Sequence, residues 1–599
     1  MKLRVLAIAV AGTAGVLVFQ APARASNVTE FPDNGSEQMA RGGAWVARAS
    51  DPLATIFNPA GLAGQPTRVT LQNNTIIEHT CFTRVQAAND TTNDPLVSGP
   101  GGTYPRVCND ISPTINPQLG ATIKLGERLG LGLLVIGPSS GGQKTFPDFI
   151  NDANGQPQAA PNRYLLIEQK GIILFPTVGL GYEVMDNLRI GASFSWGFAR
   201  LNLTSATESL NADSTTSGND TRAQIQVKDY FIPGFTLGTI WSATSHIDIA
   251  GWYKWSDSIK ATGDAGTAAN FYTKANANGD SSKVRYGDTI YPDCGTGIAS
   301  AIASQPCGNG NNASLRFAIP MEAKIGFRYH QPRAIAVATE PAVAAPPAAP
   351  ATTPATPDGE GPPAADLTAG PPGPAPSTTT ASNAPVTEYA SPHVRDPLAT
   401  DVFDVEADLT WANNSALDTI EIRFPGDATG KGTLPVAGVA GGEIPPNADQ
   451  KRGYKDVFGI RVGGDYNVIP DKLALRGGTF FETSAANPQY QNIDFAASSR
   501  FGLAAGATYR YRFGQGAKTS ALELMVGYGH VFFAEQSRTD PNASGTNALA
   551  GTSCNKANPI PGTQQCDDGN QRYRTKWPVN LGTITNSVNV INVGVAYRF

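Results

Sequence analysis

The stretch Gly137-Pro138-Ser139-Ser140-Gly141 matches a catalytic motif literally, the Gly-x-Ser-x-Gly of many hydrolases. That motif works at a strand-to-helix turn, with an acid and a histidine further along the chain. Residues 142–147, Gly-Gln-Lys-Thr-Phe-Pro, begin a helix poorly, and the five histidines are scattered. No metal, nucleotide or haem motif appears either. The sequence therefore predicts a chain that is not an enzyme and binds no cofactor.

The six cysteines fall into three close pairs, each within loop-forming sequence. They are Cys81 with Cys108, Cys294 with Cys307, and Cys554 with Cys566. No pair has the Cys-x-x-Cys spacing of a zinc site, and His79 is the one histidine near any of them, so we expect no metal site. Disulfides are permitted in exported proteins, and three of them are predicted.

Residues 1–25 have the pattern of a secretory signal peptide. Lys2 and Arg4 precede an apolar run from Val5 to Phe19, and Ala23-Arg24-Ala25 supplies small residues for cleavage after Ala25. Its removal takes away three basic residues and no acid, so the formal net charge moves from −5 to about −8. A mildly acidic mature chain with no basic block argues against a nucleic-acid partner.

Apolar and polar residues alternate with a period of two along most of the mature chain, which predicts half-buried strands. At the C-terminus, the apolar positions are Ile591, Val593, Val595, Tyr597 and Phe599. Trp and Tyr mark strand ends, as at Trp252 and Trp255, which is typical of strands that cross a membrane. After the signal there is no run of 18 apolar residues, so no transmembrane helix is expected.

These patterns predict an all-β fold, an antiparallel transmembrane barrel of about fourteen strands in a bacterial outer membrane. The expected strands are 68–78, 115–125, 131–136, 164–184, 188–201, 224–241, 247–259, 315–329, 402–424, 454–468, 473–481, 501–513, 520–533 and 592–599. Barrels of this kind have their C-terminus in the periplasm. The strand count then places all three cysteine pairs in outward loops.

A proline-rich insert separates two blocks of strands, residues 66–330 and 397–599. Within residues 331–396, twelve prolines lie between Pro341 and Pro376. Proline removes ladder donors and favours extended chain, so this segment is expected to be an unfolded periplasmic linker. It is interpreted either as a tolerated insertion or as a tether to peptidoglycan or a periplasmic protein.

Residues 26–65 show no clear alternation and are long enough to fold inside the barrel as a plug, or hatch. Their candidate functional residues are Arg41, Gly42, Gly43, Asp51, Pro52, Asn58, Pro59 and Ala60. The glycines would allow close approach of the hatch to the wall. Asn58 and Pro59 would form a fixed turn towards the first strand.

The pattern of these hatch residues, with Phe57-Asn58-Pro59-Ala60-Gly61-Leu62 at its end, resembles the FadL/TodX family of outer-membrane transporters of hydrophobic compounds. Further matches lie at 454–466 and 475–484. The resemblance implies a hatch-gated barrel of fourteen strands that passively takes up long-chain fatty acids, similar lipids or hydrocarbons. It also implies sideways exit of the cargo at a kink in the third strand, where Gly137 and Pro138 stand, since proline interrupts the ladder. In the alternative interpretation, Pro138 simply ends the strand.

The resemblance does not assign ligand residues. For a fatty acid, a lumenal arginine such as Arg461, Arg476 or Arg510 could meet the carboxylate. In the alternative interpretation, these arginines pair with Asp465 or Glu523 in an ordinary polar lumen. Expected partners are hydrophobic cargo, outer-membrane lipid, lipopolysaccharide and the barrel assembly machinery, and the chain is expected to be a monomer. The competing functions are a general diffusion porin and a structural barrel anchored through the insert.

Overall fold

The computed structural model describes residues 34–88, 90, 93–138, 143–207, 220–268, 272, 313–336, 387–389, 395–423, 434–435, 443–444, 450–514, 519–538 and 578–599. The expected signal peptide, most of the proline-rich insert and the pairs Cys294–Cys307 and Cys554–Cys566 lie outside this part of the chain. No helix among the described residues is long and apolar enough to span a membrane.

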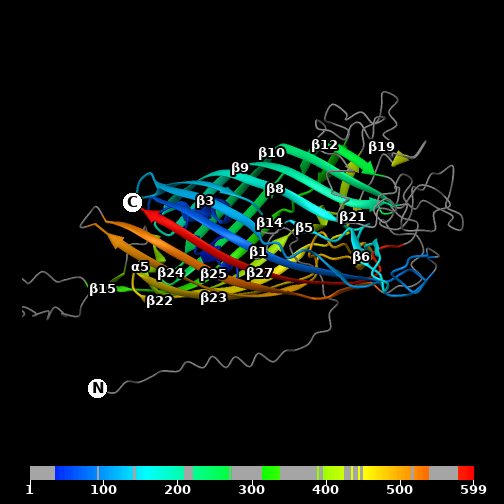
Figure 1. Cartoon of the computed structure of the whole chain (residues 1–599). Helices are drawn as coiled ribbons and strands as arrows, with labels where there is room; N and C mark the ends of the chain where they lie inside the picture. Colours follow the sequence, from blue (N-terminus) through cyan, green and yellow to red (C-terminus); the bar gives the residue numbers. More distant parts are fainter. Residues whose placement is uncertain are drawn as a thin grey trace, which may run out of the picture.

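The wall is a closed antiparallel barrel of 14 strands, as predicted (Figure 1). Its strand segments are β1 (Arg68–Arg84), β3 (Thr114–Lys124), β4 (Leu129–Ile136), β5 (Lys144–Thr145), β8 (Glu168–Met185), β9 (Leu188–Thr207), β10 (Thr221–Ser242), β11 (Ile247–Ser256), β12 (Ile259–Ala268), β13 (Ala313–Phe317), β14 (Glu322–Pro332), β17 (Asp401–Ala412), β18 (Thr419–Arg423), β21 (Gln450–Lys451), β22 (Val457–Ile469), β23 (Leu473–Glu482), β24 (Arg500–Phe513), β25 (Ser520–Phe533), β26 (Gln536–Arg538) and β27 (Gly582–Arg598). Six wall strands are each split into two consecutive segments. The barrel closes where β1 pairs with β27 along its whole length.

Short elements lie inside the barrel and at its two ends. They are α1 (Ser36–Ala40), α2 (Ala54–Phe57), η1 (Pro59–Leu62), β2 (Val107–Cys108), β6 (Phe149–Asn151), β7 (Pro157–Ala159), β15 (Ala334–Ala336), β16 (Thr387–Tyr389), α5 (Pro397–Thr400), η3 (Asn414–Ala416), β19 (Leu434–Pro435), β20 (Glu443–Ile444) and η4 (Pro488–Tyr490). We call the end that holds Phe599, α5 and β15 the C-terminal end, and the opposite end the loop end (Figure 1).

Apolar side chains cover the outside of the wall, because alternate strand residues point outward. On β27, Ile591 and Val593 are 44% and 53% exposed, whereas Asn592 between them is fully buried. Aromatic residues gather outward at the C-terminal end, where the rings of Tyr597 and Phe599 lie 4.8 Å apart. This apolar surface with aromatic ends is the one expected for a wall in contact with lipid.

The interior of the barrel differs in polarity between its two ends. Near the C-terminal end the inward residues are charged, but towards the loop end they form an apolar cluster that includes Leu201, Val227, Ile259 and Leu315. On β10 the change follows from a bulge between Asp229 and Ile232. The bulge shifts the alternation by one residue. Odd-numbered apolar residues of β10 therefore point outward after the bulge, as at Leu237, and inward before it, as at Val227.

One of the predicted disulfides is present among the described residues. Cys81 on β1 and Cys108 on β2 are bonded, at a sequence separation of 27. The bond fixes the loop after β1 against the wall at the loop end. Its thiolates are therefore not available to a metal, although His79 lies 3.3 Å from Cys81.

The orientation of the wall can be tested at Val526, which faces outward on β25 and is 53% exposed. Val526→Arg would place a charge in the hydrocarbon layer, and we expect the free energy of unfolding in lipid vesicles to fall by about 2–4 kcal/mol. Ser537→Arg, at the exposed rim on β26, is the matched control and is expected to change it little. Equal effects of the two substitutions would contradict the assigned orientation.

Candidate functional site

Residues 34–64 fill the lumen on the C-terminal side as a compact hatch made of α1, α2 and η1, and nearly every residue in it is buried. Its backbone lies directly against the wall at glycines. Gly42 has φ +63°, and a Cβ there would lie 2.6 Å from the backbone N of Thr479. Added side chains on Gly463 or Gly478 would overlap the backbone of Arg41. The wall glycines are thus as necessary as those of the hatch.

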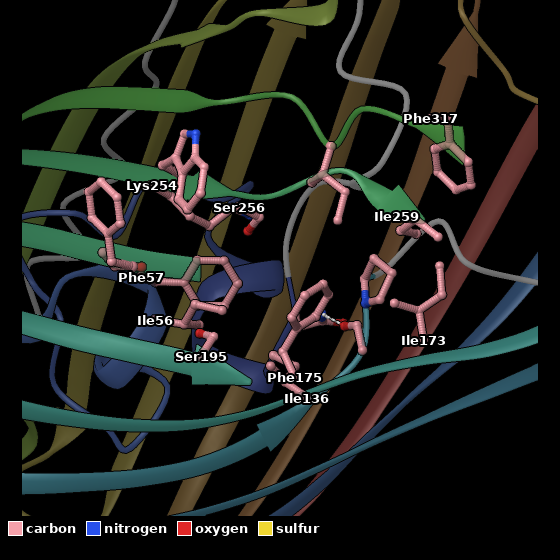
Figure 2. Close-up of a pocket in the computed structure, with 17 residues that line it drawn as sticks. Ile56, Phe57, Ile136, Ile173, Phe175, Ser195, Lys254, Ser256, Ile259 and Phe317 are labelled. Carbon is pink, nitrogen blue, oxygen red and sulfur yellow. Dashed lines mark hydrogen bonds between the residues drawn. The ribbon is translucent and has the colours of Figure 1, made fainter. Parts of the chain in front are cut away.

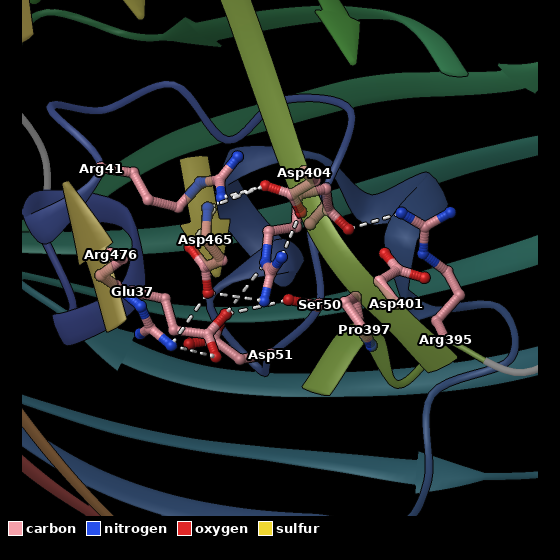
Figure 3. Close-up of polar contacts among 12 residues, drawn as sticks. Glu37, Arg41, Ser50, Asp51, Arg395, Pro397, Asp401, Asp404, Asp465 and Arg476 are labelled. Atoms are coloured by element: carbon pink, nitrogen blue, oxygen red, sulfur yellow. Dashed lines mark hydrogen bonds and ion pairs between the residues drawn. The ribbon is translucent and has the colours of Figure 1, made fainter. Parts of the chain in front are cut away.

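Two hatch arginines hold the hatch to acidic residues of the wall (Figure 3). Arg41 lies 2.6 Å from Asp404, 2.7 Å from Asp465 and 3.3 Å from Glu406, all with buried side chains. Arg48 pairs with Asp404 as well and lies 3.0 Å from Asp465. Charge-assisted contacts of this kind are strong in a buried site, and losing one partner leaves an uncompensated charge.

The hatch backbone is bound by the same wall strand. Both Trp45 and Val46 donate their backbone N–H groups to Asp408, and Ala47 donates to Glu406 at 2.6 Å. Asp404, Glu406 and Asp408 are inward residues at every second position of β17. Sequence reasoning missed this docking strand. Its signal is the alternation of the three acids with Val405, Ala407 and Leu409, which puts all three acids on one face of the strand.

The remaining predicted hatch residues shape the hatch itself. Asp51 accepts the N–H of Leu53 at 2.7 Å, ahead of Pro52 and the short helix α2. Asn58 caps η1, accepting the N–H of Ala60 and donating to the carbonyl of Val46 at 2.8 Å. Asn58-Pro59 therefore starts a helical turn within the hatch, and β1 begins later, at Arg68. Gly43, with φ +81°, lies against Arg461.

The three lumenal arginines considered for a cargo carboxylate each have a carboxylate of the protein as partner. Arg461 lies 2.9 Å from Glu482, and Arg476 lies 3.1 Å from Asp465. Arg510 lies 2.8 Å from both Glu523 and Asp396. A fatty acid would have to displace these partners, so the geometry favours the alternative of a self-paired lumen. The cargo role of these arginines stays a prediction.

The last residues of the proline-rich insert contact the hatch. Arg395 donates to the carbonyl of Ala47 at 2.7 Å, and its own N–H donates to Gly64. Burial alone would raise the pKa of Asp396, but Arg598 and Arg510 overcome it and hold that pKa below its usual range. Residues 396–400, Asp-Pro-Leu-Ala-Thr, repeat residues 51–55, and each copy starts a helical turn. This repeat is a sequence signal that was overlooked.

The wall is interrupted at Gly137 and Pro138, where the sequence predicts a kink. The last pair of β4 with β8 is Ile136 with Phe175, and pairing resumes only at Lys144 with Gln169. Residues 170–174 of β8 thus have no strand partner on this side within the described chain. Hydrogen bonds of Asn34 and Asn116 to the carbonyls of Gly137 and Pro138 hold the turned chain in place.

A pocket lies beside this interruption, between the hatch and the apolar cluster of the loop end (Figure 2). It contains about 710 Å³ of empty space, including its open side. The residues that line it are Asn34, Ile56, Phe57, Ile136, Gly137, Pro138, Ile173, Phe175, Ser195, Phe235, Thr236, Lys254, Trp255, Ser256, Ile259, Phe317 and Ile319. They come from the hatch and from many wall strands without a local motif, so no sequence pattern indicates them.

The pocket is lined mainly by aromatic and branched apolar side chains, and its one ionisable lining residue is already paired. The ammonium of Lys254 lies 2.7 Å from Glu322 and faces the ring of Trp252. Ser195 exchanges a hydrogen bond with Thr177 at 2.9 Å. Such a lining can bind an apolar molecule without leaving a polar group unsatisfied.

A closed barrel with an apolar exterior, a plugged lumen and an apolar pocket defines the class of outer-membrane transport barrels. The family described as outer membrane protein transport protein (OMPP1/FadL/TodX) matches residues 382–564. The resemblance to the FadL/TodX family predicted from the motifs is therefore confirmed.

One solved structure supports the fold, and two others were matched with lower scores. A FadL homologue of Pseudomonas aeruginosa has a TM-score of 0.57 at 14% identity, over 95% of this chain and 99% of that one. The toluene transporters TbuX of Ralstonia pickettii and TodX of Pseudomonas putida are 12% and 13% identical, each with a TM-score of 0.47 over 96% of this chain and 99% of theirs. No curated protein sequence matches the chain.

The ion pairs of Arg41 can be tested by Arg41→Met, which leaves Asp404, Glu406 and Asp465 without that cation. We expect the free energy of local opening of the hatch to fall by about 3–5 kcal/mol. Hydrogen exchange of the backbone N–H groups of residues 45–47 measures it. Arg128→Met is the control, because the Arg128–Asp186 pair is exposed and worth at most about 1 kcal/mol. Unchanged exchange in Arg41→Met would contradict the role of these pairs.

Proposed function

We propose that this chain takes up hydrophobic compounds passively across the outer leaflet, binds them in the pocket beside the hatch and releases them sideways into lipid. The observation that supports it best is the position of the pocket. Its lining joins hatch residues Ile56 and Phe57 to Gly137 and Pro138 at the interrupted wall. A molecule bound there would lie directly next to the one place where β4 and β8 lose their pairing.

The polarity of the lumen supports movement of the cargo from the loop end to the pocket and then sideways. From the loop end, a hydrophobic molecule meets the apolar cluster around Leu201, Val227 and Leu315 before it reaches the pocket. Beyond the pocket, the hatch and its buried ion pairs block the C-terminal end. Transfer of an apolar molecule through that charged region costs more than transfer into lipid, so the lateral route is the favourable one.

The hatch is connected to the interruption through Asn34. Its side chain donates to the carbonyl of Gly137 at 2.7 Å and accepts from Asn116 at 3.0 Å. A displacement of the hatch would break both hydrogen bonds and release the turned chain after β4. This connection supports gating of the lateral opening by the hatch.

The pocket favours uncharged cargo. Lys254 is its one ionisable lining residue, and Glu322 neutralises it at 2.7 Å. A carboxylate of a fatty acid would need to compete with Glu322 for the ammonium, whereas a hydrocarbon needs no such exchange. An uncharged aromatic hydrocarbon such as toluene suits the aromatic and apolar lining of the pocket. A diffusion porin is disfavoured by the hatch, and the tether role of the insert stays a prediction.

Filling the pocket tests the proposed route. Ser256→Trp is expected to lower uptake of toluene by intact cells about tenfold, because the indole occupies the volume that the cargo needs. Ser537→Trp on the exposed rim controls for the added side chain, and heat-modified gel mobility confirms folding. Normal toluene uptake by a folded Ser256→Trp protein would argue against the pocket as the route.

The preference for uncharged cargo is tested by Glu322→Gln, which frees the ammonium of Lys254. We expect affinity for dodecanoate to rise about tenfold while that for toluene changes little. Displacement of a neutral fluorescent hydrophobic dye from the purified protein measures both. Glu421→Gln, on the outer face of β18, is the control. If dodecanoate binds equally well before and after Glu322→Gln, Lys254 does not discriminate by charge.

A further inference from the structure

Basic residues form a row on the outer face of four adjacent wall segments, β9, β10, β12 and β13, near the loop end. Arg200 on β9 lies directly opposite Lys228 on β10, and Lys260 on β12 lies directly opposite Arg316 on β13. All four side chains are exposed and point away from the lumen. We call Arg200, Lys228, Lys260 and Arg316 the basic belt. The segments that carry it lie side by side along one part of the wall (Figure 1).

Like charges directly opposite each other on one face of a sheet repel, because their Cβ atoms are only about 5 Å apart. Acids nearby compensate the belt in part. Asp257 lies 2.7 Å from Lys260, and Glu421, opposite Arg316, lies 4.0 Å from Arg423. No carboxylate of the described residues forms an ion pair with Arg200 or Lys228. Two facing cations therefore remain where an anion would stabilise them.

Exposed aromatic residues lie next to these cations, on the side nearer the middle of the membrane. The β10 bulge pushes Tyr230 and Phe231 outward, with exposures of 67% and 56%. Trp196 meets Phe231 edge to face with the ring centroids 5.5 Å apart and donates to the carbonyl of Tyr230 at 2.8 Å. Lys228 itself lies 5.7 Å from the centre of the Tyr230 ring. Exposed aromatics of this kind settle at the boundary between acyl chains and headgroups.

The height of the belt agrees with that boundary. The outward residues of β9 run from Ile190 through Phe194 and Trp196 to Arg200. Ten residues span about 33 Å along a strand, and a tilt of about 40° reduces this to roughly the 25 Å height of the apolar band of such barrels. Arg200 and its neighbour Lys228 thus lie just beyond the hydrocarbon, at the level of lipid headgroups.

We propose that the basic belt binds the phosphate groups of a phosphorylated outer-leaflet lipid of the lipopolysaccharide class. Arg200 and Lys228 hold one phosphate between them, Lys260 and Arg316 extend the site, and the rings of Trp196, Tyr230 and Phe231 lie against the acyl chains. The anion relieves the repulsion between the facing cations. This site lies on the outer face of the wall and does not depend on the proposed transport function.

Native mass spectrometry of the full chain in detergent tests the site with bisphosphorylated lipid A as probe. We expect the quadruple variant Arg200→Gln, Lys228→Gln, Lys260→Gln and Arg316→Gln to bind it at least about tenfold more weakly than the unaltered chain. Exchanging Lys for Arg and Arg for Lys at the four positions should preserve binding. Lys455→Gln, an exposed basic residue beside β22 on another part of the wall, is the control and should have no effect.

Two further probes identify what is bound. Lipid A without phosphates should bind the unaltered chain no better than it binds the quadruple variant, and inorganic phosphate should not compete. In detergent without lipid, the quadruple variant should melt at an equal or higher temperature, since a repulsion has been removed, which also verifies its folding. If folding fails, Arg200→Gln with Lys228→Gln replaces it. Equal lipid A binding by variant and unaltered chain, equal binding of the dephosphorylated lipid, or competition by inorganic phosphate would overturn the proposal.

Discussion

Carboxylates buried on the inner face of β17 are the constraint on which the structure depends. Asp404, Glu406 and Asp408 are almost completely removed from solvent, which is costly for charged groups without partners. Arg41, Arg48 and the backbone N–H groups of the hatch provide those partners. The barrel therefore needs the hatch to provide partners for its buried carboxylates. The hatch, which has little regular structure, needs the barrel to hold its conformation.

The same constraint divides the interior into two regions with different chemistry. Towards the C-terminal end, hatch, wall and the residues around Asp396 form one ion-paired body. Towards the loop end, the β10 bulge and the inward apolar residues make a hydrophobic interior that ends at the pocket. The pairing of β4 with β8 ends at Ile136, between these two regions. A hydrophobic solute thus has a favourable environment up to the interruption and an unfavourable one beyond it.

Local patterns predicted the wall well and the interior poorly. Alternation placed β23 and β25 within one residue of their bounds and β9 at its observed start, because each strand carries its own period-two signal. The bulge was missed because the adjacent apolar residues Tyr230 and Phe231 interrupt the alternation. The sequence does not show which half of β10 then points its apolar residues into the lumen. Arg41 and Asp404 are 363 positions apart, and the pocket draws single residues from many strands, so neither leaves a local signature. The hatch motif could be recognised, but its partners could not.

Single-channel conductance of the chain with and without residues 26–65 tests most directly that the hatch closes the lumen. The unaltered barrel should show little or no conductance in a planar bilayer. Deletion of the hatch should produce a large, stable, cation-preferring conductance, because the freed carboxylates of β17 would line a water-filled pore. An unaltered chain that already conducts as an open pore, or a folded deletion variant that stays closed, would contradict this account.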